Sequence, residues 1–84
     1  MQDQLLLELA AEFAKMKDTD EVAAFLDALL TPKEQIEIPK RLQIIKLLKT
    51  GVAQRDISIQ LKVGVATVSR GSRELAKGNF KNIK

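Results

Sequence analysis

The side chains with the most chemical potential gather between Gln54 and Ser72, where amide, guanidinium and hydroxyl groups alternate with small and apolar residues. The apolar positions keep helical spacing on both sides of a break at residues 62–64; they are Ile57, Leu61, Val65, Val68 and Leu75. Two short helices joined by a tight turn form a helix-turn-helix, whose second helix enters the major groove of DNA. A generic two-helix hairpin has the same apolar pattern. The Ala-Thr-Val-Ser-Arg run at 66–70 after the turn favours DNA binding.

The chemistry that the composition excludes is equally informative. The chain of 84 residues has no cysteine and no histidine, so it offers no thiolate metal ligand and lacks the commonest general base. No constellation of carboxylates or lysines suggests catalysis, and no glycine-rich phosphate loop is present. We therefore expect neither an enzyme nor a metal site.

The elements that position these residues are predicted to be helices throughout, giving a single all-α domain over residues 1–84. One helix is expected over about Gln4 to Met16, and another after Asp18, with Glu21 completing a capping-box-like pair. Their core-facing positions are Leu5, Leu6, Leu9, Phe13 and Met16 in the first, and Val22, Phe25, Leu26 and Leu29 in the second.

A third helix is predicted to begin at Thr31-Pro32-Lys33-Glu34, which combines a cap, a proline at the first helical position and a glutamate at the third. It runs to about Thr50, with Gly51 suited to the left-handed residue after it. Pro39 is expected to kink this helix or split it in two. Beyond Pro39 the apolar surface is wider than one stripe, which indicates partners on more than one side. In so short a chain, a second subunit is the expected partner.

Charge divides the chain into two regions. Residues 1–30 carry seven acids and two lysines, a net charge of −5, whereas residues 31–84 carry twelve bases and four acids, a net charge of +8. This division suits an assembly module over 1–50, a phosphate-facing module over 54–76 and a short basic tail over 78–84, although ordinary solvated charge is the simpler alternative. The N-terminal residues are not basic and no segment could span a membrane, so we expect a cytoplasmic protein.

Residues 29–75 resemble the Trp repressor family. The resemblance rests on Leu-Leu-Thr-Pro-x-Glu at 29–34, Arg41 followed by Ile44-Ile45, Gln-Arg-Asp-Ile at 54–57 and, most specifically, Gly-Val-Ala-Thr-Val-Ser-Arg-Gly-Ser at 64–72. It implies an all-helical, intertwined homodimer that binds operator DNA, with the amino acid L-tryptophan as corepressor and no other cofactor.

The resemblance also implies the ligand site. The matching positions are Leu30 (through its backbone carbonyl), Thr31, Arg41, Ile44, Thr67, Arg70, Gly71 and Glu74. Thr67, Arg70, Gly71 and Glu74 share one helical face. The Arg70 guanidinium suits a carboxylate, that of Arg41 can stack on an aromatic ring, and glycine at 71 leaves room for a flat ring. Alternatively, both arginines contact phosphates or form salt bridges.

On the DNA side, the resemblance implies readout through water at the start of the second motif helix, by Gly64, Val65, Ala66 and Ser69. Arg55 is expected to reach a phosphate or a guanine edge. The candidates for backbone phosphates are Lys49, Gln54, Ser72, Arg73 and Lys77, and for each lysine a solvated surface position is an equal alternative.

The sequence departs from the family pattern at several positions. Lys62 occupies the turn position that usually holds glycine; if left-handed it costs about 1–2 kcal/mol, part of which a phosphate contact offsets. Glu74 replaces a serine near the ligand amine, so it either pairs with that ammonium or competes for Arg70. The final family helix is largely replaced by residues 78–84, in which Phe80 and Ile83 are expected to dock.

Three functions remain open at this point. The first is a homodimeric repressor of genes for tryptophan biosynthesis or transport, activated by L-tryptophan, which positions the recognition helices. The second is a regulator of the same fold that responds to another small ligand or to none. The third is a helical interaction module that does not touch DNA, suggested by the acidic first third of the chain.

Overall fold

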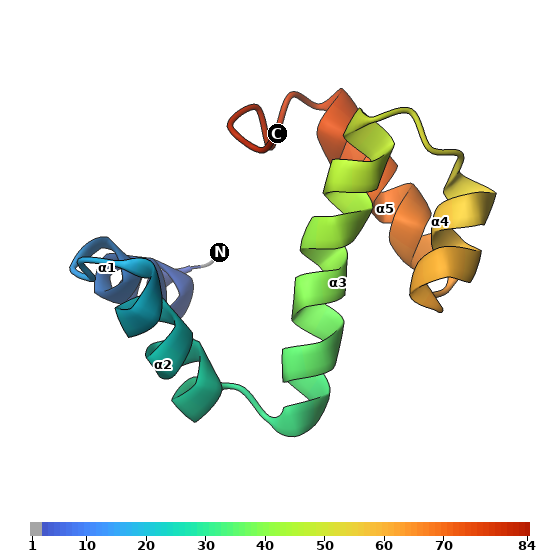
Figure 1. The fold of residues 1–84 in the computed structure, drawn as a ribbon. Coiled ribbons are helices and arrows are strands. Elements are labelled where there is room, and N and C mark those ends of the chain that lie inside the picture. Colours follow the sequence, from blue (N-terminus) through green and yellow to red (C-terminus); the bar gives the residue numbers. More distant parts are fainter. Residues whose placement is uncertain (1–2) are drawn as a thin grey trace. The chain divides into compact units, whose positions relative to one another are not determined.

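The computed structural model describes residues 3–84 and contains five α-helices in this range, with no strand (Figure 1). They are α1 (Gln4–Ala14), α2 (Thr19–Leu29), α3 (Pro32–Lys49), α4 (Gln54–Leu61) and α5 (Val65–Ala76). The all-α prediction is therefore confirmed. The chain forms two compact units, one extending to Gln35 and the other covering Ile36–Lys84. Within residues 3–84, none of the helices has the length and apolar character needed to cross a membrane.

Local capping explains where α2 and α3 begin. The Asp18 carboxylate accepts a hydrogen bond of 2.9 Å from the Glu21 backbone amide, as predicted, while the Glu21 carboxylate accepts one from the amide of Lys17. At α3 the capping box is reciprocal. The Thr31 hydroxyl accepts from the Glu34 amide at 3.2 Å, and the Glu34 carboxylate accepts from the Thr31 amide at 2.8 Å. Two of the amides that a helix start leaves without partners are thereby satisfied.

Helix α3 continues through Pro39, so the alternative that this proline splits the helix in two is wrong. A proline removes only one backbone donor and crowds only the preceding turn. The remaining hydrogen bonds of an 18-residue helix, started by a complete capping box, are sufficient to carry it past that defect. Helix α3 therefore extends unbroken to the residues that pack against α5.

The core of the unit 36–84 lies where α3, α4 and α5 meet. Ile44, Ile57 and Val68, one from each of these helices, are at most 1% exposed. Around them pack the partly buried side chains of Leu47, Leu48, Val52, Leu61 and Val63. Because each helix contributes one fully buried β-branched residue, the three helices are held by a single shared contact region.

The turn between α4 and α5 depends on an unusual backbone conformation. Lys62 has φ 57° and ψ 50°, so it adopts the left-handed conformation that the sequence left open for this position. Ser58 stabilises the turn by donating its hydroxyl to the Val63 carbonyl at 2.5 Å, and the Ser58 carbonyl accepts from the Val63 amide at 3.1 Å. Gly51, with φ 88°, likewise takes the left-handed conformation expected after α3.

Within residues 3–35, no side chain is fully buried. Phe13 and Phe25 join α1 to α2 through an edge-to-face contact with ring centroids 5.4 Å apart. However, Leu5 and Leu6 are 79% and 63% exposed, and Leu29 is 50% exposed. The expectation that the apolar stripes of both helices are buried is thus wrong for the single chain. Two helices of 11 residues each have too little facing surface to cover both stripes.

Candidate functional site

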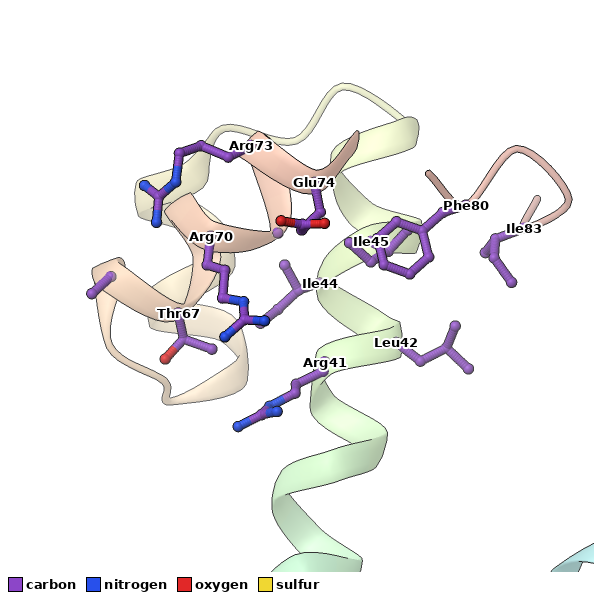
Figure 2. A pocket seen from close by; sticks show the side chains of 12 residues that line it. Arg41, Leu42, Ile44, Ile45, Thr67, Arg70, Arg73, Glu74, Phe80 and Ile83 are labelled. Atoms are coloured by element: carbon purple, nitrogen blue, oxygen red, sulfur yellow. The ribbon is translucent and has the colours of Figure 1, made fainter. Parts of the chain in front are cut away.

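A cavity of about 680 Å³ lies in the unit 36–84, between α3, α5 and the segment 78–84. Figure 2 shows Arg41, Thr67 and Arg70 on one side of it, with Leu42, Phe80 and Ile83 on the other. The remaining lining residues are Ile44, Ile45, Ala66, Gly71, Arg73 and Glu74. The cavity thus combines a cationic end with an apolar end, and its volume falls in the range of small-molecule sites.

Six of the eight predicted ligand residues line this cavity: Arg41, Ile44, Thr67, Arg70, Gly71 and Glu74. Among them, Ile44 is only 1% exposed, so it serves mainly as core. The other two belong to the first unit and do not line the cavity. The Leu30 carbonyl accepts a hydrogen bond of 3.0 Å from the Gln35 side chain, and Thr31 caps α3.

Gly71 marks the close approach of α5 to α3. A Cβ atom at this position would lie 3.0 Å from Ile44 Cγ2 and 3.3 Å from Ile45 Cδ1. The space that the missing side chain leaves is therefore already occupied by α3, whereas the sequence suggested that it accommodates a flat ring. Glycine at 71 sets the helix–helix distance, and thereby the width of the cavity.

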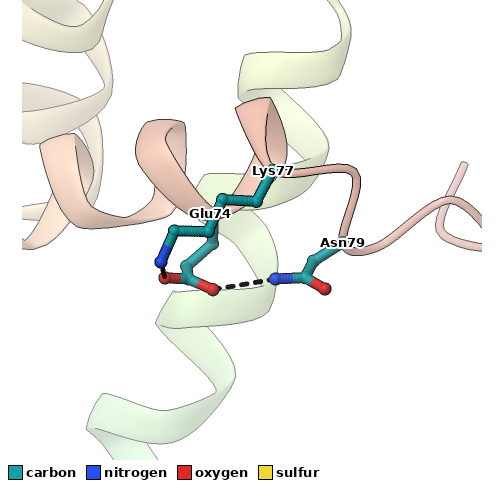
Figure 3. A network of polar contacts seen from close by, with 3 residues as sticks. All are labelled: Glu74, Lys77 and Asn79. Carbon is teal, nitrogen blue, oxygen red and sulfur yellow. Dashed lines mark hydrogen bonds and ion pairs between the residues drawn. The ribbon is translucent and has the colours of Figure 1, made fainter.

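Glu74 is held by residues that follow it rather than by Arg70 (Figure 3). Its carboxylate forms an ion pair of 3.0 Å with Lys77 and accepts a hydrogen bond of 2.8 Å from the Asn79 side chain. Among the described side chains, no hydrogen bond or ion pair joins Glu74 to Arg70. The hydrogen bond and charge of Lys77 lower the pKa of Glu74 most; burial opposes this effect, and Asn79 and Arg70 add smaller contributions.

These contacts have a consequence for Arg70. Because Lys77 and Asn79 already neutralise and orient the Glu74 carboxylate, the Arg70 guanidinium is not committed to it. Both Arg41 and Arg70 are exposed side chains at the cationic end of the cavity. Two guanidinium groups there are suited to a carboxylate and to the face of an aromatic ring.

The predicted DNA-facing residues lie mainly at the start of α5. Gly64, the residue before α5, is exposed together with Val65 and Ala66, and a Cβ atom at Gly64 would meet nothing within 4 Å. The Ser69 hydroxyl donates to the Gln54 amide oxygen at 2.9 Å and so joins α5 to α4. Small, exposed residues at the end of a helix permit close approach to a groove.

The remaining residues predicted to contact DNA fall into two groups: those that are exposed at the surface and those that contact other parts of the chain. Arg55, Lys62 and Arg73 are exposed, whereas Ser72 is half-buried. The Lys49 ammonium donates to the carbonyl oxygens of Phe80 and Ile83, and Lys77 pairs with Glu74. These two lysines therefore have structural roles that the sequence did not indicate.

Sequence reasoning missed the apolar end of the cavity. Leu42 and Ile45 were attributed only to a wide apolar helix surface, and Phe80 and Ile83 to a docked tail without a site. Both tail residues line the cavity, where Ile83 is half-buried and Phe80 remains 40% exposed. Their spacing, three residues apart in an otherwise basic segment, is the signal that both face the same way.

Comparison with known proteins identifies the family. The family model described as Trp repressor protein matches residues 4–82. A Trp operon repressor homolog of Vibrio vulnificus is 38% identical over 73 residues, which cover 86% of this chain and 69% of the relative. One from Vibrio cholerae is 45% identical over 51 residues, covering 60% and 50%, respectively.

A more distant relative extends the same match. The Trp operon repressor homolog of Xylella fastidiosa is 30% identical over 70 residues, covering 82% of this chain and 76% of the relative. No solved structure matches the chain significantly. The family match spans all five helices and residues 78–82 of the segment that borders the cavity. The chain therefore belongs to the Trp repressor protein family of DNA-binding transcription regulators.

Proposed function

We propose that this protein is a homodimeric repressor that binds operator DNA through α4 and α5, with L-tryptophan as its corepressor. The observation that carries the proposal is the cavity beside α5, in which Arg41, Thr67 and Arg70 form a cationic end. Cavity-lining residues such as Thr67 and Arg70 and most of the predicted groove-facing residues belong to the same helix, α5. A ligand in the cavity therefore acts directly on the helix that reads DNA.

The proposed mechanism is a shift of population between orientations of α5. In a dimer, two recognition helices must lie about 34 Å apart to enter successive major grooves. A tryptophan wedged between α3 and α5 stabilises the orientation in which this spacing is met. The factor by which tryptophan raises the affinity for DNA is then set by how much more tightly tryptophan binds this orientation of α5 than the others.

Exposed apolar side chains support the proposed dimer. Leu5, Leu6 and Leu7 of α1 are 79%, 63% and 66% exposed, and Ile36 and Ile38 of α3 are 60% and 42% exposed. So many large apolar residues on one small chain are typical of an interface. We expect Leu6→Glu to yield monomers in sedimentation equilibrium. Ala11→Glu, which adds the same charge about 140° around α1, is the control.

Ligand binding can be measured without background because the chain has no tryptophan and no tyrosine. Titrating the protein into L-tryptophan should shift the ligand's own indole emission and raise its anisotropy. Arg70→Ala should abolish this response, since it removes the partner of the ligand carboxylate. Arg55→Ala, an exposed arginine of α4 outside the cavity, should leave it unchanged.

DNA binding completes the test. Duplexes selected from a random-sequence library with tryptophan present should bind more tightly with tryptophan than without it. Here Arg55→Ala should weaken binding, and the affinity should fall steeply with rising salt as counterions are released. The proposal would be contradicted if the Arg70→Ala protein still bound the duplex tightly and if tryptophan raised its affinity for DNA as much as it does for the unmodified protein.

A second candidate is a regulator of the same fold that responds to another ligand or to none. The Glu74 carboxylate at the cavity favours this candidate, since its negative charge repels the carboxylate of an amino-acid ligand. Selected duplexes that bind equally well with and without tryptophan, together with no change in indole emission, would support this candidate and exclude the first.

A further inference from the structure

The segment 78–84 turns back from the end of α5 onto the end of α3. Gly78 has φ 94° and Phe80 has φ 65°, so the turn contains a left-handed aromatic residue. Such a conformation is rare for a bulky side chain and persists only where surrounding contacts hold it. We refer to residues 78–84 as the strap.

Contacts at both of its ends hold the strap in place. At one end, the Lys49 ammonium of α3 donates to the Phe80 carbonyl at 2.6 Å and also to the Ile83 carbonyl. At the other, the Asn79 side chain donates to the Glu74 carboxylate at 2.8 Å, and the Asn79 amide donates to the Glu74 carbonyl at 3.3 Å. The strap thus connects α5 to α3 through polar contacts.

The strap also forms part of the cavity surface. Phe80 and Ile83 line the apolar end together with Leu42 and Ile45, while Glu74 lies between this end and the two arginines (Figure 2). Glu74 accepts a hydrogen bond from Asn79 of the strap and lines the same cavity as Phe80 and Ile83. The strap therefore determines both the shape of the apolar end and the direction of the carboxylate.

We propose that the strap completes the ligand site: Asn79, together with the ion pair from Lys77, holds the Glu74 carboxylate at the cavity for the ammonium group of an amino acid, Phe80 closes the apolar end, and Lys49 is the clamp that holds Phe80 and Ile83. This inference rests on the proposed function, which supplies the amino-acid ligand. Asn79 is a positioning residue, because it acts on the ligand through Glu74. The site then distinguishes a free amino acid from the corresponding acid without an amine.

Two indole ligands separate the parts of this proposal. L-Tryptophan carries the ammonium group and indole-3-propionate lacks it, and both fluoresce in a protein without tryptophan. Asn79→Ala should lower the affinity for tryptophan about five- to tenfold and leave that for indole-3-propionate unchanged. Asn82→Ala, which removes an exposed asparagine of the same strap, should change neither affinity. Phe80→Ala should lower the affinity for both ligands by a similar factor.

The clamp is tested on the chain without ligand. The Ile83 amide donates to the Phe80 carbonyl at 3.1 Å, so its hydrogen exchange reports whether the strap is closed. Lys49→Gln should raise the exchange rate of this amide and lower the affinity for both indole ligands. Lys46→Gln, the same change on an exposed lysine of the same helix end, should do neither.

Failure of the role proposed for the strap can be distinguished from failure of the proposed tryptophan binding. Equal tryptophan affinities for Asn79→Ala and Asn82→Ala, or unchanged Ile83 exchange in Lys49→Gln, would overturn the role of the strap even if tryptophan binds. If the unmodified chain binds neither indole ligand, the proposed corepressor is wrong and, with it, the assignment of the strap to that ligand. The exchange measurement would still establish whether Lys49 clamps the strap.

Discussion

The two units of this protein use apolar residues in opposite ways. In the unit 36–84, three helices bury Ile44, Ile57 and Val68 almost completely against one another. In the unit that ends at Gln35, side-chain caps begin α2 and α3, which α4 and α5 lack, yet Leu5 and Leu6 are mostly exposed. Hydrogen bonds near a helix end can thus define a helix without deciding what covers it. Residues 36–84 thus form a buried core by themselves, whereas the apolar side chains of α1 remain exposed in the single chain.

The largest effect is expected in the core of the second unit. Ile57→Ala should lower the free energy of unfolding by about 2–5 kcal/mol, because it leaves a cavity beside Ile44 and Val68. Ile59→Ala, two residues away and 66% exposed, should change it by about 0.5 kcal/mol or less. Urea denaturation measures both, and equal losses would show that the buried core is not the source of the difference between the units.

A smaller effect is expected where α5 crosses α3. Gly71→Ala forces a Cβ atom to within 3.0 Å of Ile44, which is itself fully packed. Overpacking of this kind costs about 1–3 kcal/mol, and the better helix propensity of alanine offsets about 1 kcal/mol of that. We expect a net loss of stability in thermal denaturation. Unchanged or higher stability would mean that the contact between α3 and α5 adjusts easily.

The cap of α3 should contribute through local contacts alone. Thr31→Ala removes the hydroxyl that accepts from the Glu34 amide, at a cost of about 1 kcal/mol. Thr31→Ser keeps this oxygen and should retain most of the stability. Helical circular dichroism during urea denaturation distinguishes them; an alanine variant as stable as the serine variant would show that the cap does not define this boundary.

The smallest effect is expected with pH, and it involves one glutamate from each unit. Hydrogen bonds from the backbone and side chain of Thr31 lower the pKa of Glu34, and the side-chain hydrogen bond and the positive charge of Lys77 lower the pKa of Glu74. Folding therefore favours the ionised form of both, and their contribution is complete above about pH 5, near the upper end of the ordinary glutamate range.

That contribution is lost as the pH falls through the two lowered pKa values, because the unfolded chain then binds protons more readily. Denaturation measured between about pH 3 and pH 6 should show stability declining toward acid. Replacing both glutamates, as Glu34→Gln and Glu74→Gln, should make the decline shallower. A decline that is equally steep in the double variant would assign the acid sensitivity to other carboxylates.

Much of the fold was predictable because its signals are local. The Thr31–Glu34 capping box, the left-handed Gly51 and the turn at Lys62 all depend on residues within five positions of each other. The shared face of Thr67, Arg70, Gly71 and Glu74 follows from helical spacing, and all four residues line the cavity. The passage of α3 through Pro39 was not predictable in this way, because the whole length of the helix outweighs one missing donor.

The sequence by itself determined the helices, their caps, the family and the face of α5 that borders the cavity, since each depends on spacing along one chain segment. Only the tertiary structure decided that Gly71 accommodates α3 and that Lys49 binds the strap. These contacts join α5 and the strap to α3. Long flexible side chains such as Lys49 have many partners within reach, and only the packing of the helices selects one.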